Sequence, residues 1–189
     1  MKLHLNLTLR RALLAAMAMV ALHTADADMT PTNGHMYVTG AVSPTTEEWT
    51  EAWGSTTGVL SVGTSVGAGT LTLTSGTYTT PNSIFLGGKG YESTGTKAEN
   101  GALEIKEGVT LTVNGSTNVG NSQIGGIGTL TLNGGTLNAG NALYVGVNAG
   151  SGTVTAKDGA TITVASGSTG AVFAMSHRNI SGLTDTVTL

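Results

Sequence analysis

From Val59 onward the sequence repeats itself, and this repetition limits the folds open to the chain more than any other feature. Copies of a glycine-headed unit begin at Gly69, Gly101, Gly128 and Gly152, at intervals of 32, 27 and 24 residues. Such intervals are typical of solenoids and are too short for propeller blades of about 40–45 residues. The clearest copies are GAGTLTLTSGTYTT (67–80), GIGTLTLNGGTLNA (126–139) and GSGTVTAKDGATIT (150–163), with the more diverged NGALEIKEGVTLTV at 100–113.

Within each unit the apolar residues alternate with polar ones. In the unit that starts at Gly128, Leu130 and Leu132 face one way, whereas Thr129 and Thr131 face the other. Each unit follows a short apolar run that a glycine closes, and we expect three short strands in every interval. These preceding runs lie at 59–63, 84–87, 123–125 and 143–146, with a last run at 171–175.

Strands of this length, with turns recurring in register, predict an all-β fold: a right-handed parallel β-helix of four to five short coils with a small N-terminal helical cap. Stacked strands lie ~4.8 Å apart, so the column would be roughly 20–24 Å tall. A β-sandwich and a propeller fragment are the alternatives. The repeats are expected to fill 59–189 and to end in the middle of a coil.

The composition agrees with this prediction. Residues 28–189 hold 29 Gly and 31 Thr. Glycine is poor in helices, whereas threonine favours strands, so a helical bundle and an ordinary α/β enzyme are excluded. The chain has no cysteine, which excludes disulfides and thiolate metal sites.

Residues 1–27 are typical of a secretory signal peptide. Lys2, Arg10 and Arg11 form a positive segment, and the apolar stretch 12–22 is too short to span a bilayer of ~30 Å as a helix. Small residues at Ala25 and Ala27 predict cleavage before Asp28. An uncleaved N-terminal membrane anchor is the alternative. We expect export to the cell surface, the outer membrane, the periplasm or the medium, with no transmembrane segment in the mature chain.

The segment 28–58 differs from the repeats and is expected to cap them. Ser43 and Pro44 suggest an N-cap and first helical residue, and Thr45 with Glu48 suggests a capping box, so we predict a helix over 44–53. Trp49 and Trp53, four residues apart, would share one helical face. They would form either an aromatic ligand site or, as we favour, a lid over the open end of the solenoid.

The repeats carry a family resemblance. LYVGVNAGSGTVTAKDGATITV (143–164) and IGGIGTLTLNGGTLNAG (124–140) resemble the passenger-associated β-strand repeats of bacterial autotransporter proteins. The likeness covers 59–189 and implies a β-helical passenger and a surface location. Members of that family usually end in an outer-membrane β-barrel, and this sequence does not contain one.

Catalytic, cofactor-binding and metal-binding residues are not predicted. Gly87–Glu92 and Gly125–Leu130 begin like calcium-binding repeats but lack the ligand aspartate. Glu104 and Glu107 share a unit with Lys106, which fits a solvated face better than a proton-transfer pair. The two histidines after the leader, His35 and His177, are too few for a metal triad, and Ser176 has only its sequence neighbour His177.

The charge also argues against nucleic acid as a partner. Residues 28–189 have five basic and ten acidic side chains, a net charge of about −5, so no basic cluster can neutralise several phosphates. The expected partners are instead a glycan or a surface protein, bound by loops such as 88–100 on a rigid scaffold.

These observations predict an exported, non-enzymatic β-helical surface or matrix protein, similar to an adhesin-like autotransporter passenger fragment. A truncated gene remnant with no independent role is one alternative. The other is an ice-binding protein, because Thr-x-Thr would place threonine arrays on the outside, although threonine is also simply a strand former. Thr-x-Thr recurs at 70–72, 72–74, 110–112, 129–131, 153–155, 161–163 and 186–188.

Self-association is expected at the C-terminal strand 182–189, where Leu183, Asp185, Val187 and Leu189 share one face. Its open edge would accept other strands, and Asp185 alone would oppose this.

Overall fold

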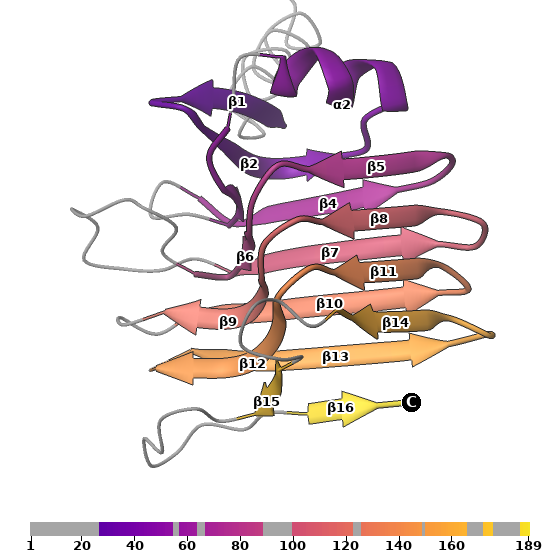
Figure 1. Ribbon diagram of the computed structural model, residues 1–189. Coiled ribbons are helices and arrows are strands. Elements are labelled where there is room, and N and C mark those ends of the chain that lie inside the picture. Colours follow the sequence, from indigo (N-terminus) through magenta and orange to yellow (C-terminus); the bar gives the residue numbers. More distant parts are fainter. Residues whose placement is uncertain are drawn as a thin grey trace, which may run out of the picture.

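The computed structural model describes residues 27–54, 57–63, 67–88, 100–122, 126–148, 150–165, 172–175 and 186–189. It is a β-solenoid column of about four turns, built from parallel strands, with one short helix at its N-terminal end (Figure 1). The predicted all-β parallel β-helix with a small helical cap is therefore confirmed. The predicted signal peptide lies outside the described residues, except Ala27.

Three sheets run along the column, and the chain passes through sheets B, C and A in every turn. Sheet A contains β3 (Leu60–Val62), β6 (Ile84–Leu86), β9 (Thr117–Ser122), β12 (Ala142–Asn148) and β15 (Val172–Met175). Sheet B contains β4 (Gly69–Leu73), β7 (Gly101–Lys106), β10 (Ile127–Asn133), β13 (Ser151–Lys157) and β16 (Thr186–Thr188). Sheet C contains β5 (Thr77–Thr80), β8 (Thr110–Val113), β11 (Thr136–Ala139) and β14 (Thr161–Val164).

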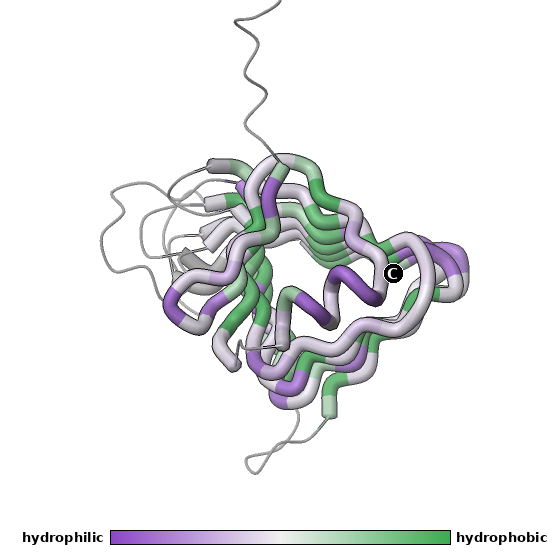
Figure 2. The backbone as a smooth tube through the Cα atoms, turned by 90° about the horizontal axis from the view of Figure 1, so that it is seen from above, coloured by the Kyte–Doolittle hydropathy of each residue, from purple (hydrophilic) through white to green (hydrophobic). Residues whose placement is uncertain are grey.

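Equivalent residues of successive repeats stack directly on one another. Gly69, Gly101, Gly128 and Gly152 are aligned partners in sheet B, as the repeat spacing predicted. The leucines that follow them point into the column and are almost completely buried. Viewed down its axis, the apolar positions line the inside of the superposed turns (Figure 2). The first inner row of sheet B is Leu71, Leu103, Leu130 and Val154.

The parallel ladders extend N-terminal of Val59. Strand β2 (His35–Val42) bridges sheets A and B, because it pairs with β3 through Met36–Val38 and with β4 through Gly40–Val42. An additional strand, β1 (Asp28–Thr32), pairs antiparallel with β2. The segment before Val59 therefore supplies both the first rung and part of its cover.

The helix α2 (Thr46–Trp53) follows the sheet B part of β2, the place where the chain enters sheet C in each later turn. It lies across the end of the column, over β5 (Figures 1 and 2). The capping box predicted at Thr45 and Glu48 is present. The alternative reading of Ser43 as N-cap and Pro44 as first helical residue is wrong, because the Thr45 hydroxyl accepts the hydrogen bond from the Glu48 backbone N–H at 3.2 Å.

One strand of sheet A differs from the sequence expectation. The third apolar run was expected at 123–125, which lies outside the described residues, and the sheet A strand of this turn is β9, Thr117–Ser122. Val119 supplies the inward apolar side chain between Leu86 and Val145. Its neighbour Asn118 is buried, and its amide donates to the Ile84 carbonyl oxygen at 3.0 Å and to that of Ser116 at 3.3 Å. These bonds let a polar residue occupy a buried position that an apolar pattern cannot reveal.

Close backbone contact explains the glycine column of sheet B. A Cβ atom at Gly101 would overlap the Val62 carbonyl oxygen and the Gly87 backbone nitrogen, although Gly101 itself has an ordinary φ. By contrast, a Cβ at Gly67 would have its nearest neighbour 3.9 Å away, in Thr39. Gly101 is therefore required because a side chain has no space there, whereas the structure leaves space for a side chain at Gly67.

We expect Gly101→Ala to lower the free energy of unfolding by about 1–3 kcal/mol, because backbone atoms must move to admit the methyl group. The matched variant Gly67→Ala should change it by less than about 0.5 kcal/mol. Urea unfolding of the mature chain measures both. Equal stability of the two variants would contradict the backbone-contact explanation.

Candidate functional site

The connections from sheet A to sheet B share one corner of the column and carry the length variation of the repeat. They span 63–68, 87–100, 123–126, 149–150 and 176–185. The sheet B to sheet C connections and the sheet C to sheet A connections have nearly constant lengths, apart from the connection between β14 and β15. The sheet B to sheet C connections are 74–76, 107–109, 134–135 and 158–160. The insertion 88–100 therefore connects strands that meet at this corner. Residues 64–66, 89–99, 123–125, 149 and 176–185 of these connections lie outside the described residues.

Backbone hydrogen bonds hold both sides of this corner in place. The Gly87 N–H donates to the Val62 carbonyl at 2.9 Å, and the Gly69 N–H donates to the Asn100 carbonyl at 3.0 Å. Gly87 has φ +61°, in the left-handed region that favours glycine. Connections of different length thus start from and return to fixed positions.

The outer face of sheet C carries two columns of polar residues. One column contains Thr77, Thr110, Thr136 and Thr161, and the other contains Thr79, Thr112, Asn138 and Thr163. All are exposed or half-buried. The predicted Thr-x-Thr array contains 110–112 and 161–163 of these columns but not 77–79 and 136–138. Aligning the second strand of each repeat would have found them.

On sheet B the equivalent columns are interrupted. Thr70 and Thr72 are followed on the next rung by Ala102 and Glu104, before Thr129 and Thr131. Glu104 is half-buried and Lys106 is exposed, in agreement with the solvated face predicted for this unit. The most regular threonine surface in the described residues is therefore that of sheet C.

The helical cap contains an aromatic cluster. Trp49 packs edge-on against Tyr78 with ring centroids 5.4 Å apart, and its centroid lies 6.0 Å from that of Trp53. Trp49 Nε1 donates to the Thr79 carbonyl at 2.9 Å, and the Tyr78 hydroxyl donates to the Pro44 carbonyl at 2.9 Å. The indoles are 3% and 9% exposed, so the pair closes this end of the core, as the lid interpretation predicts.

Two ionisable side chains near the cap have shifted pKa values. Hydrogen bonds from the backbone and side chain of Thr45 lower the pKa of Glu48, so this carboxylate favours the folded state at neutral pH and loses that effect as pH falls through its lowered pKa. Burial, and then the charge of Glu48, raise the pKa of Tyr78. Tyr78 therefore stays a neutral hydrogen-bond donor at neutral pH.

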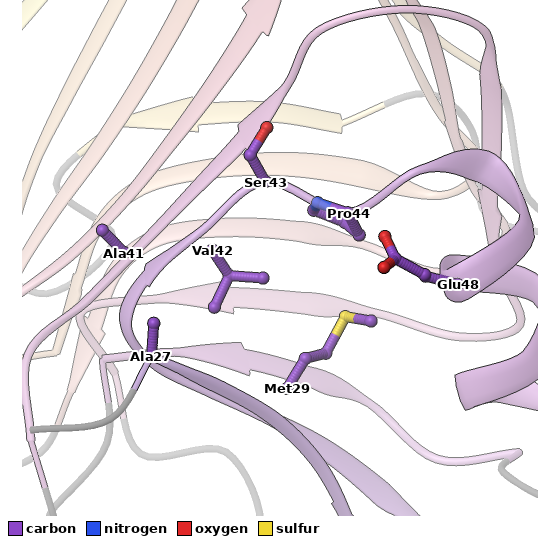
Figure 3. A pocket seen from close by; sticks show the side chains of 7 residues that line it. All are labelled: Ala27, Met29, Ala41, Val42, Ser43, Pro44 and Glu48. Carbon is purple, nitrogen blue, oxygen red and sulfur yellow. The ribbon is translucent and has the colours of Figure 1, made fainter.

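A hollow of about 370 Å³ lies between the β1–β2 pair and the start of α2 (Figure 3). Met29 and Val42 give it apolar walls, and Glu48 is the charged residue among its described lining. The Glu48 carboxylate already accepts the Thr45 N–H at 2.7 Å, so its role here is helix capping.

Among the described residues, the last rung of the column exposes apolar side chains. Phe173 and Met175 stand in the inner rows of sheet A, next to Leu143 and Val145, yet they are 53% and 41% exposed. A hollow of about 320 Å³ there has a mostly apolar lining: Leu143, Val154, Ile162, Val164, Phe173, Val187 and Leu189. As predicted, β16 continues the repeat near the end of the sequence, with Val187 beside Val154. Leu183 and Asp185 lie outside the described residues.

The described residues contain no group of three or more His, Asp or Glu side chains that could hold a metal ion. His35 has a structural contact, because its Nδ1 accepts the Val59 N–H at 3.2 Å. Ser176, His177 and Glu92 lie outside the described part. Within that part, no helix has the length and apolar character needed to cross a membrane.

Comparison with known proteins finds no matching family model, no similar curated protein and no similar solved structure.

Proposed function

We propose that this chain is an exported, non-enzymatic surface or matrix protein that displays binding loops on a β-helical column, in the manner of an adhesin-like autotransporter passenger. The observation that carries this proposal is the shared corner between sheets A and B. In repeat proteins, insertions that gather on one side of the stack often form the binding face.

The separation of roles within each turn supports the proposal. The inner rows and ladder hydrogen bonds fix the strands, whereas a corner connection can change length without losing a ladder bond. The leader at 1–27 and the sequence resemblance to autotransporter repeats favour a surface location. A glycan or a surface protein is the proposed ligand.

Replacing residues 89–99 with a short Gly-Ser linker should abolish most binding, because it removes the longest connection and keeps both anchors. The mature chain and this variant are compared on a glycan array and on host cells, with Lys157→Ser, at the end of β13 next to a sheet B to sheet C turn, as a control. Equal binding by the two chains, or no binding by either, would argue against display at this corner. Cell fractionation tests export, and uncleaved protein in the cytoplasm would overturn it.

The regular array on sheet C favours ice binding as a second candidate. Its hydroxyl-bearing positions repeat at about 4.8 Å between strands and about 6.6–6.8 Å along each strand. Seven of its eight positions are threonine.

If sheet C binds ice, Thr112→Tyr should reduce thermal hysteresis to the buffer level, because a large ring breaks the flat array at its centre. The control is Thr131→Tyr on sheet B, which should retain the wild-type value. Absence of hysteresis and of ice-recrystallisation inhibition in the wild-type chain would remove this candidate.

Self-association through the open C-terminal end is part of the proposal. Within the described residues, strands β14, β15 and β16 each pair with a strand on one side only, and unpaired edges recruit other strands.

Val187→Lys should weaken self-association of the mature chain, because it places a charge beside the apolar hollow at this end. Thr188→Lys, on the outer side of the same strand, is the control and should have a smaller effect. Sedimentation at protein concentrations on the order of tens of micromolar gives the oligomeric state. A monodisperse wild-type monomer would refute this interaction.

A further inference from the structure

The N-terminal end of the column covers the edges of two of its three sheets. In sheet A, β1 pairs with residues 35–39 of β2. In sheet C, α2 covers the edge strand β5, and Trp49 Nε1 donates to the Thr79 carbonyl at 2.9 Å. Sheet B begins with residues 40–42 of β2, which pair with β4 on one side. No described strand pairs with their other side, which we call the sheet B edge.

The ladder fixes the direction of the backbone groups at this edge. The Gly40 N–H donates to the Ala68 carbonyl at 2.9 Å, on the β4 side. Because successive residues of a strand direct their N–H and C=O groups to opposite sides, Ala41 directs both groups away from β4. Ala41 is exposed and lines the hollow of about 370 Å³ (Figure 3). Its backbone therefore offers one donor and one acceptor to an added strand.

The side chains around Ala41 indicate which strand fits. Val42 stands in the inner row of sheet B, and Met29 lines the same hollow. Both are half-buried, so an added strand can place an apolar side chain on them. In Figure 3 they lie between Ala41 on one side and Glu48 on the other. Glu48 is exposed, and beyond its capping bond its carboxylate can accept a further hydrogen bond.

The charge of this end of the column favours a basic partner. Residues 27–54 contain no lysine or arginine and four acidic side chains: Asp28, Glu47, Glu48 and Glu51. The α-amino group that cleavage before Asp28 creates offsets one of these charges, so the net charge of the end is about −3. Such a surface attracts basic segments and repels acidic ones.

We propose that the sheet B edge binds an extended segment of another protein in which apolar and basic side chains alternate. The segment adds a strand to the edge and exchanges two hydrogen bonds with the Ala41 backbone. One apolar side chain enters the hollow over Met29 and Val42, and one basic side chain reaches Glu48. In strand addition the main-chain bonds supply affinity and the pockets for alternate side chains supply specificity. This contact goes beyond the proposed display function, because it lies at the cap and not at the corner between sheets A and B.

Fluorescence anisotropy of a dye-labelled peptide mixed with the mature chain tests the proposal. The probe has blocked ends and alternates valine and lysine over about eight residues, a usual strand length. We expect saturable binding that weakens as the salt concentration rises.

Two control peptides separate charge from strand pairing. One has glutamate in place of lysine, and the other is N-methylated at every residue, so that it cannot donate a main-chain hydrogen bond. Neither should bind. No binding by the valine–lysine probe, or equal binding by either control peptide, would overturn the proposal.

Substitutions locate the site. Ala41→Pro removes the outward N–H without removing a ladder bond, and should weaken binding about tenfold. Ala41→Val retains the N–H and should bind within about twofold of the wild type. Glu48→Gln removes the charge and should weaken binding about two- to fivefold. Its matched control is Glu51→Gln on the same helix, because Glu51 does not line the hollow.

Thermal unfolding checks that each variant is folded, and the N-methylated peptide decides the role of main-chain pairing if Ala41→Pro is not. Wild-type affinity in folded Ala41→Pro, or an equal loss in Glu51→Gln, would refute docking at this edge. Reduced self-association of Ala41→Pro without the probe would assign the edge to a second copy and overturn the proposal. The variant with residues 89–99 replaced separates this result from the display function, because it should bind the probe even if all cell binding is lost.

Discussion

In-register stacking of each strand on its equivalent is the constraint from which the rest of the structure follows. In a parallel ladder a residue must fit the same position above and below it, so inner rows become apolar columns and crowded backbone positions become glycine columns. Gly101 shows the second case, because Val62 and Gly87 leave no space for a side chain. Length can then vary where no ladder bond is lost, which here is mostly at the corner between sheets A and B.

Stacking also makes the ends of the column unlike its middle. Each internal rung is covered on both sides, whereas a terminal rung exposes its inner row. At the N-terminal end, α2 occupies the place of a sheet C strand, and its Trp49 packs on Tyr78 and beside Trp53. At the other end Phe173 and Met175 remain exposed in inner rows. The same apolar pattern therefore gives buried core in one place and an exposed apolar surface in another.

The sequence was sufficient for the fold because its strongest signals are those that stacking requires. Glycine spacing predicted the alignment of Gly69 through Gly152, and alternation predicted which leucines are internal. The sequence prediction misplaced strand β9 because its buried residues Thr117 and Asn118 are polar, and a search for apolar runs does not detect them. The sequence predicted only part of the sheet C columns. A local Thr-x-Thr pattern does not show which sheet a strand joins, so it does not show which threonines stack on one another. Which side chains lie next to one another on an outer surface depends on the register of the strands, and only the structure gives that register.

Three buried polar atoms in the described residues lack hydrogen-bond partners, and their positions give them different meanings: Trp53 Nε1, Ser61 Oγ and Thr117 Oγ1. Thr117 stands in an inner column between Ile84 and Leu143, where a valine would fit the same space. Ser61 lies between Tyr37 and Phe85 on the neighbouring strands of sheet A. Both are within continuous ladders, where an unmet hydroxyl is a cost of packing. Trp53 instead belongs to the indole pair that closes the N-terminal end of the core, and its Nε1 is shut off from solvent. Its unmet donor is a cost of closing the column with an indole.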